Sequence, residues 1–147
     1  MRGTAFAILL VAGLIGTAAG QEPARIGTIK TLKGDARVIG GSGSAAASVG
    51  GAVHQNETLE TGADGAVGVT FIDNTTLSMG PNSRITLTKV VFNPDRGDFA
   101  FATDIAKGTF MFVSGSIAKL APQSVQIATP VSTIGIRGTR FLVKIEP

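Results

Sequence analysis

The clearest pattern in this chain is an alternation of apolar and polar positions with a period of two. In residues 66–71, Val67, Val69 and Phe71 fall on one face of an extended segment, and small or polar residues fall on the other. This pattern predicts a strand buried on one face. Further segments of extended character are bounded by Gly, Pro, Asn or Asp: Ile26 to Leu32, Ala36 to Ile39, Glu57 to Thr61, Thr75 to Met79 and Ile85 to Phe92.

Two predictions concern the N-terminal part of this pattern. The turn Lys33-Gly34-Asp35 separates the first two extended segments, which predicts a β-hairpin. The following residues, Gly40 to Gly51, are made of Gly, Ser, Ala and a single Val. Because such a segment has little apolar surface to bury, we predict a mobile loop over residues 40–51.

The C-terminal half predicts most of the core. Ile85, Leu87 and Val91 are expected to share one strand face, and Ser116 to Leu120 has spacing compatible with one helical turn. We therefore predict an all-β single domain of short strands, built as a sandwich, a roll or a short solenoid, with at most one short helix. Four phenylalanines at i, i+2 spacing in two consecutive segments are expected to line one sheet surface: Phe99, Phe101, Phe110 and Phe112.

The first 20 residues have the order of a secretory signal peptide. Met1-Arg2 is a positive n-region, Ala5 to Ile15 is apolar, and Ala18-Ala19-Gly20 supplies small residues for cleavage. Cleavage after Gly20 would leave residues 21–147 as one exported domain, in the periplasm or outside the cell, with no transmembrane helix. We also expect no cytoplasmic effector segment.

Composition narrows the functional classes. The chain has no Cys, Trp or Tyr, which excludes thiolate chemistry and removes the usual aromatic anchors of sugar sites. Once Arg2 is removed, 12 basic residues face 10 acidic ones without a basic run, so we expect no nucleic-acid binding. The one histidine, His54, is predicted to lie in an exposed polar turn, so we predict neither an enzyme nor a metal or cofactor site.

The most informative stretch runs from Val125 to Ile145. Its residues describe two extended segments, Val125 to Thr129 and Phe141 to Ile145, joined by a constrained turn. Arg137 is a charge among apolar residues, so we predict that it ties this turn to another part of the domain. An anion-binding nest of backbone N–H groups under Arg137 is the alternative. The motif residues are Thr129, Pro130, Gly135, Arg137, Gly138, Thr139 and Phe141.

This motif resembles the signature of the FecR domain family. The resemblance extends over Leu59-Glu60-Thr61-Gly62, the run from Val69 to Leu77, Pro81-Asn82-Ser83 and the segment from Gly108 to Ser114-Gly115. It implies a non-enzymatic periplasmic β domain of the kind that relays signals to a sigma factor in iron-transport regulators. We expect neither the cytoplasmic sigma-binding segment nor the internal membrane helix of those regulators here, so only the module itself carries over.

Two functions remain open from the sequence. One is an interaction or regulatory module that binds another envelope protein of unknown identity, and the other is a structural or adhesin-like surface protein. The last extended segment is relevant to the first of these two functions, because further strands follow this motif in most of the relatives that the chain resembles. A final strand without a neighbour would offer unpaired backbone groups to a partner, which makes Leu142, Val143 and Lys144 a candidate docking edge.

Overall fold

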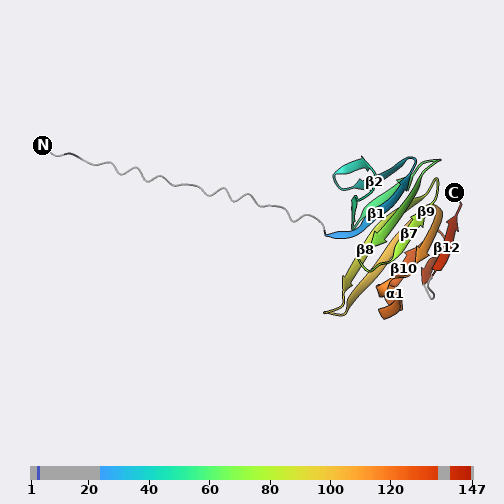
Figure 1. Cartoon of the computed structure of the whole chain (residues 1–147). Coiled ribbons are helices and arrows are strands. Elements are labelled where there is room, and N and C mark those ends of the chain that lie inside the picture. Colours follow the sequence, from blue (N-terminus) through green and yellow to red (C-terminus); the bar gives the residue numbers. More distant parts are fainter. Residues whose placement is uncertain (1–2, 4–23, 136–139, 147) are drawn as a thin grey trace.

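The computed structural model describes residue 3, residues 24–135 and residues 140–146 (Figure 1). Within these residues, twelve strands form one extended, curled sheet, and the single short α-helix is α1 (Ser116–Leu120), followed by the 3-10 turn η1 (Pro122–Ser124). The prediction of an all-β domain with one short helix is confirmed. The strands are β1 (Arg25–Lys33), β2 (Ala36–Gly40), β3 (Gly43–Ala46), β4 (Ala52–His54), β5 (Glu57–Thr61), β6 (Ala66–Phe71), β7 (Thr76–Met79), β8 (Arg84–Asn93), β9 (Asp98–Val113), β10 (Val125–Ala128), β11 (Thr133–Gly135) and β12 (Arg140–Ile145).

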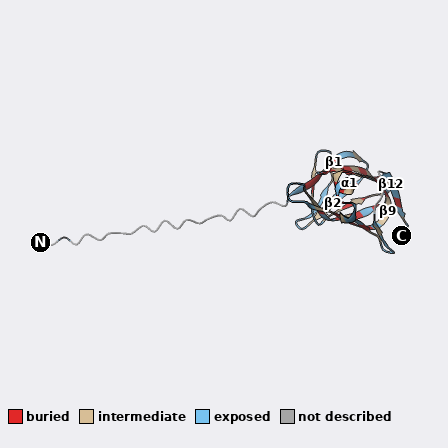
Figure 2. Ribbon diagram, turned by 90° about the horizontal axis from the view of Figure 1, so that it is seen from below, coloured by how far each residue is buried: buried red, intermediate tan, exposed pale blue. Residues whose placement is uncertain are grey.

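The sheet folds into two walls that share the long strand β9. The first wall has the order β4-β1-β6-β7-β9-β12 and uses the C-terminal part of β9. The second has the order β3-β2-β5-β8-β9-β10-β11 and uses the N-terminal part of β9. Seen from below, the strands form opposite walls, and buried residues occur along both of them (Figure 2).

The core between the walls is apolar and contains a chain of aromatic rings. Phe71 and Phe101 meet edge to face with centroids 5.1 Å apart, and Phe101 meets Phe112 at 6.4 Å. Since Phe71 and Phe112 belong to the first wall and Phe101 to the second, these rings join the two walls. Burial of each ring is worth about 1.5 to 3 kcal/mol.

The walls are connected by stacked arches, turns that carry the chain from one wall to the other. Lys33–Asp35 links β1 to β2, Gly62–Gly65 links β5 to β6, and Gly80–Ser83 links β7 to β8. Strand β9 also passes from one wall to the other, at Gly108, a positive-φ residue within the strand. The chain therefore crosses between the walls repeatedly at one side of the domain.

Hydrogen bonds tie each arch to the next. Gly62 N–H donates to Asp35 O at 2.9 Å, and Asn82 N–H donates to Gly62 O at 3.0 Å. Ser83 continues the series, because its Oγ accepts from Thr109 N–H at 3.1 Å. Because the arches satisfy one another's backbone groups, this side of the domain forms one continuous structure.

The hairpin predicted across Lys33-Gly34-Asp35 is wrong. β1 pairs with β4 and β6, whereas β2 pairs with β3 and β5, so the turn is an arch between walls. The prediction of a loop over residues 40–51 is also wrong in part. This segment includes β3, which pairs with β2 from Arg37↔Ala46 to Gly40↔Gly43. The side chains of β3 are exposed, so backbone hydrogen bonds rather than apolar burial account for this strand.

Two predictions within the long strands require correction. A register irregularity between Thr86 and Lys89 shifts the alternation of β8, so Val90 is buried where Val91 was expected. The two phenylalanine segments belong to the single strand β9, and Phe99 is half-buried beside Phe92 instead of lying in the core. The predicted core positions Phe101, Phe110 and Phe112 are confirmed.

Candidate functional site

β12 lies at the outer edge of the first wall (Figure 1). It pairs antiparallel with β9, with Arg140 opposite Val113 and Ile145 opposite Gly108, and it pairs with no other described strand. The backbone groups on its other side are therefore unpaired within the part of the chain that the structure describes. The neighbouring edge strand of the second wall, β11, pairs only with β10 among described strands.

The inner face of β12 is anchored in the core. Val143 is buried, and Phe141 stacks on Phe112 with ring centroids 4.9 Å apart and planes 5° from parallel. Ile145 packs against the core from a half-buried position. The strand is thus held in place by one face, as the alternation of Phe141, Val143 and Ile145 predicts.

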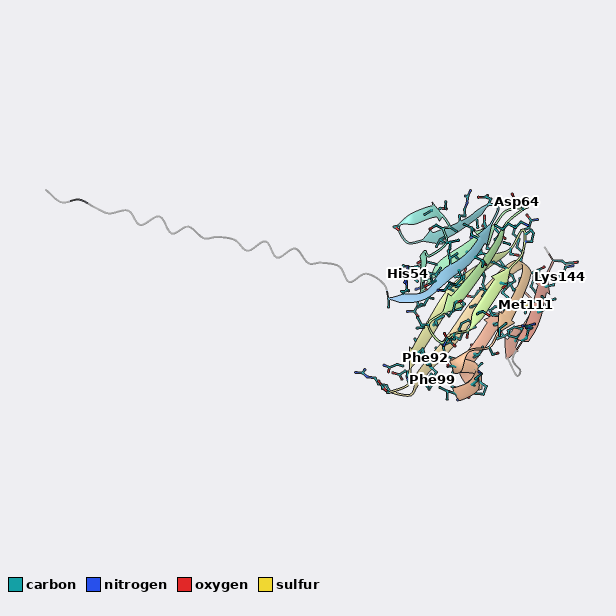
Figure 3. The ribbon with its side chains drawn as sticks, in the orientation of Figure 1. His54, Asp64, Phe92, Phe99, Met111 and Lys144 are labelled. Carbon is teal, nitrogen blue, oxygen red and sulfur yellow. The ribbon has the colours of Figure 1, made fainter. Side chains whose placement is uncertain are left out.

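The outer face of β12 is exposed and continues an uncharged row across the first wall. Leu142 is 63% exposed and lies opposite Met111, which is 39% exposed. Met111 lies opposite Ser78, and Ser78 lies opposite Gly68. Lys144 projects from the outer edge of the domain (Figure 3). An exposed apolar pair beside an unpaired strand edge is a surface suited to protein contact.

The structure describes only some of the motif residues that precede β12. Thr129 closes the turn between β10 and β11, because its N–H donates to Ser132 O at 2.7 Å and its Oγ1 accepts from Ser132 N–H at 3.1 Å. Pro130 is an exposed residue of this turn. Arg137, Gly138 and Thr139 lie outside the described residues, so their predicted roles stay predictions.

Gly135, another motif residue, lies at the end of a strand. It ends β11, its φ lies outside the positive range, and a Cβ built on it would meet no described heavy atom within 4 Å. The close approaches occur at other glycines. A Cβ on Gly34, Gly65 or Gly108 would lie 2.1 to 2.2 Å from the nearest atom of a neighbouring arch.

A buried charge also occurs where the sequence did not place one. Asp73 is 0% exposed, and its carboxylate accepts from Thr75 N–H at 3.1 Å, Thr75 Oγ1 at 2.7 Å and Ile117 N–H at 3.1 Å. Its backbone O accepts from Ser116 N–H at 2.8 Å. The turn between β6 and β7 thereby holds the start of α1.

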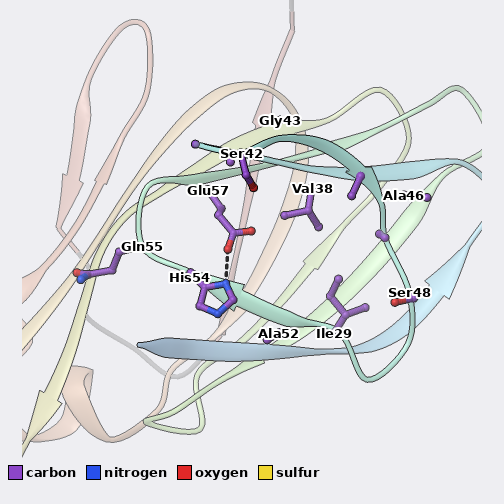
Figure 4. Close-up of a pocket in the computed structure, with 15 residues that line it drawn as sticks. Ile29, Val38, Ser42, Gly43, Ala46, Ser48, Ala52, His54, Gln55 and Glu57 are labelled. Atoms are coloured by element: carbon purple, nitrogen blue, oxygen red, sulfur yellow. Dashed lines mark hydrogen bonds and ion pairs between the residues drawn. The ribbon is translucent and has the colours of Figure 1, made fainter. Parts of the chain in front are cut away.

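A hollow lies at the opposite end of the domain from β12, between β2, β3 and β4 (Figure 4). Its volume is about 660 Å³, with Ile29 and Val38 on its apolar side. His54 Nδ1 and Glu57 Oε1 form a close hydrogen-bonded pair at its polar end. His54 was predicted to lie in a solvated turn, but its side chain is 30% exposed and that of Glu57 is 14% exposed.

The surroundings of the His54–Glu57 pair limit the chemistry that it can support. The His54 side chain has no other hydrogen bond in the described chain, so no hydroxyl of these residues is hydrogen-bonded to it as a nucleophile. Within the same residues, no group of three His, Cys, Asp or Glu side chains is placed to hold a metal ion. The spacing of His54 and Glu57 across a two-residue turn is the sequence signal from which their contact could have been predicted.

Comparison with known proteins places this chain in a family. The family model for the FecR protein matches residues 57–147, which is more than half of the chain, and the chain belongs to the FecR family. The match begins at β5 and includes the arches Gly62–Gly65 and Gly80–Ser83, the bend at Gly108, Asp73 and β12. The family suggests a regulatory or signalling domain of the cell envelope. No curated protein and no solved structure matches the chain.

Among the described helices, none is both long enough and apolar enough to cross a membrane.

Proposed function

We propose that this protein is a non-enzymatic interaction module of the bacterial envelope that binds a protein partner along the unpaired edge of β12. The observation that carries the proposal is the combination of an anchored inner face with a free edge and an exposed Met111–Leu142 pair. Strand addition supplies affinity through backbone hydrogen bonds, and the side chains beside the edge supply selectivity. Membership of a regulatory family supports this function over a passive structural or adhesin-like one.

The proposal places the protein in the periplasm. Residues 1–20 have the order of an export signal, and the family is associated with the envelope. We expect the mature protein to begin at Gln21 or an adjacent residue, because the small residues Ala18 to Gly20 suit the signal peptidase. Mass analysis of protein from the envelope fraction checks this, and an intact Met1 on cytosolic protein contradicts it.

The docking edge is tested with one variant of the outer face and one of the backbone. Leu142→Glu keeps the strand but adds a charge beside the edge, and we expect it to fold normally and to reduce crosslinking to the partner at least tenfold. Val143→Pro instead breaks the pairing of β12 with β9, because Gly80 N–H donates to Thr109 O and the alternation of β9 therefore directs the Val143 N–H toward Phe110. It should abolish partner binding together with the strand, so a thermal melt must accompany it.

Val131→Glu is the matched control, since Val131 is 87% exposed in the turn between β10 and β11. It introduces the same charge into an exposed apolar position outside β12. The edge is not the docking site if Leu142→Glu retains every partner, or if Val131→Glu loses partners equally.

A further inference from the structure

The edge of β12 is complementary to itself. We propose that a second copy of this chain pairs antiparallel with β12, in the register that places Val143 opposite Val143 of the other copy. This inference rests on the proposed function, because it uses the same docking edge and names its occupant. In this register Arg140 lies opposite Glu146, Phe141 opposite Ile145 and Leu142 opposite Lys144.

The alternation of β12 restricts the registers that are available. Opposite residues on paired strands point to the same face, and Phe141, Val143 and Ile145 point inward whereas Leu142 and Lys144 point outward. A shift of one residue would place inward residues opposite outward ones and would bring the core face of one copy to the solvent side of the other. Only shifts of two residues preserve both faces.

Charge then selects among these registers. In the register centred on Val143, Arg140 and Glu146 of the two copies form two opposite-charge pairs related by the two-fold axis. Moving the centre to Leu142 places Arg140 opposite Lys144, and moving it to Lys144 places the two Lys144 side chains opposite each other. Like charges that lie directly opposite destabilise strand pairing. The Lys144–Glu146 contact within one chain, at 3.5 Å between exposed side chains, is too weak to prevent the exchange.

Pairing in this register also covers the exposed apolar residues. Leu142 lies beside Met111 in each copy, and the two Leu142 side chains become diagonal neighbours across the new strand pair. The stem of Lys144 lies against Leu142 of the other copy while its ammonium stays in water. One continuous apolar strip then runs from Met111 of one copy to Met111 of the other.

The contact is small, so its affinity should be modest. Seven residues of each chain pair, and the surface covered is at the lower end of that of specific interfaces, so we expect a dissociation constant on the order of micromolar. Occupation of the edge by a second copy would compete with any other partner. The fraction of free edges would therefore depend on protein concentration.

Charge exchange tests the register in the exported protein by sedimentation equilibrium. Arg140→Glu and Glu146→Arg each create two like-charge pairs, and each should raise the dimer dissociation constant about tenfold. The double variant restores opposite charges with the order reversed, and it should return to within about threefold of the wild type. Lys30→Glu, a change of equal charge on the outer side of β1, should leave the constant unchanged.

A wild type that remains monomeric at concentrations of about 1 mM overturns the proposal, and so does a double variant that stays as weak as the single ones. The masses of crosslinked products separate this inference from the proposed function. If Leu142→Glu abolishes an adduct with a different protein while the wild type is monomeric, the docking edge stands and its second-copy occupant is refuted. If the edge variants change neither adduct nor oligomeric state, both proposals fail.

Discussion

Gly108→Ala is expected to destabilise the domain by about 3 kcal/mol, which corresponds to a fall in melting temperature of about 10 °C. Gly108 is the point at which β9 passes from one wall to the other, and its φ is +109°. A Cβ there would lie 2.1 Å from Ser83 Oγ and 2.4 Å from Ser83 Cα, so the backbone of the neighbouring arch would have to move. The measurement is thermal or urea unfolding of wild type and variant.

Gly97→Ala is the matched control because it separates backbone strain from the close contact. Gly97 also has positive φ, +67°, but a Cβ there would meet no described atom within 4 Å. Its substitution should cost only the conformational penalty, about 1 kcal/mol. Equal losses in the two variants would show that the packing of Gly108 against Ser83 contributes nothing to stability.

The strands could be predicted because their alternation is a local property. Val67, Val69 and Phe71 are buried as expected, and α1 has the expected bounds of Ser116 and Leu120. In both cases the period of the apolar positions identifies the element without knowledge of its neighbours. The prediction of buried positions failed in the second half of β8, where an irregularity near Lys89 shifts the alternation of buried and exposed residues by one residue.

The connections between strands could not be predicted in the same way. A glycine turn between two apolar segments is compatible with a hairpin, in which the strands pair, and with an arch, in which they face each other across the core. Gly34 has the positive φ that either arrangement requires, at +64°. The contact of Gly34 with Asp64, 30 residues later in the chain, favours the arch over the hairpin. The sequence around Gly34 gives no sign of this contact.

β3 shows a second limit of local inference. Gly43 to Ala46 have low strand propensity and bury no side chain, so composition predicts a loop. The strand exists because β2 presents a free edge beside it and the connecting turn is short. Edge pairing of this kind depends on the neighbouring strand rather than on the side chains of the segment itself.

The candidate site was predicted as far as its own alternation allowed. The sequence indicated that Phe141, Val143 and Ile145 face inward and that Leu142 and Lys144 face outward, and the structure agrees. It could not indicate that β12 pairs with the C-terminal part of β9 or that Met111 lies beside Leu142. Those facts depend on the bend at Gly108, which determines the part of β9 that joins the first wall.

The second large loss of stability is expected when Asp73, whose carboxylate is buried, is substituted. Asp73→Ala is expected to destabilise the domain by about 3 to 5 kcal/mol, because it leaves Thr75 N–H, the Thr75 hydroxyl and Ile117 N–H without their acceptor in a buried site. Asp73→Asn keeps the shape but replaces one acceptor oxygen with a donor, so we expect a smaller loss of about 1 to 3 kcal/mol. Urea unfolding measures both.

Asp64→Ala is the control, because Asp64 is an exposed aspartate in an arch with one long hydrogen bond, 3.3 Å from Asp35 N. Its loss should be below about 1 kcal/mol. Gly115 shows why the Asp73 site cannot adapt, since a Cβ at Gly115 would lie 2.4 Å from Asp73 O and 2.3 Å from Thr75 N. If Asp73→Ala unfolds at the same urea concentration as Asp64→Ala, the turn between β6 and β7 does not hold α1 through this carboxylate.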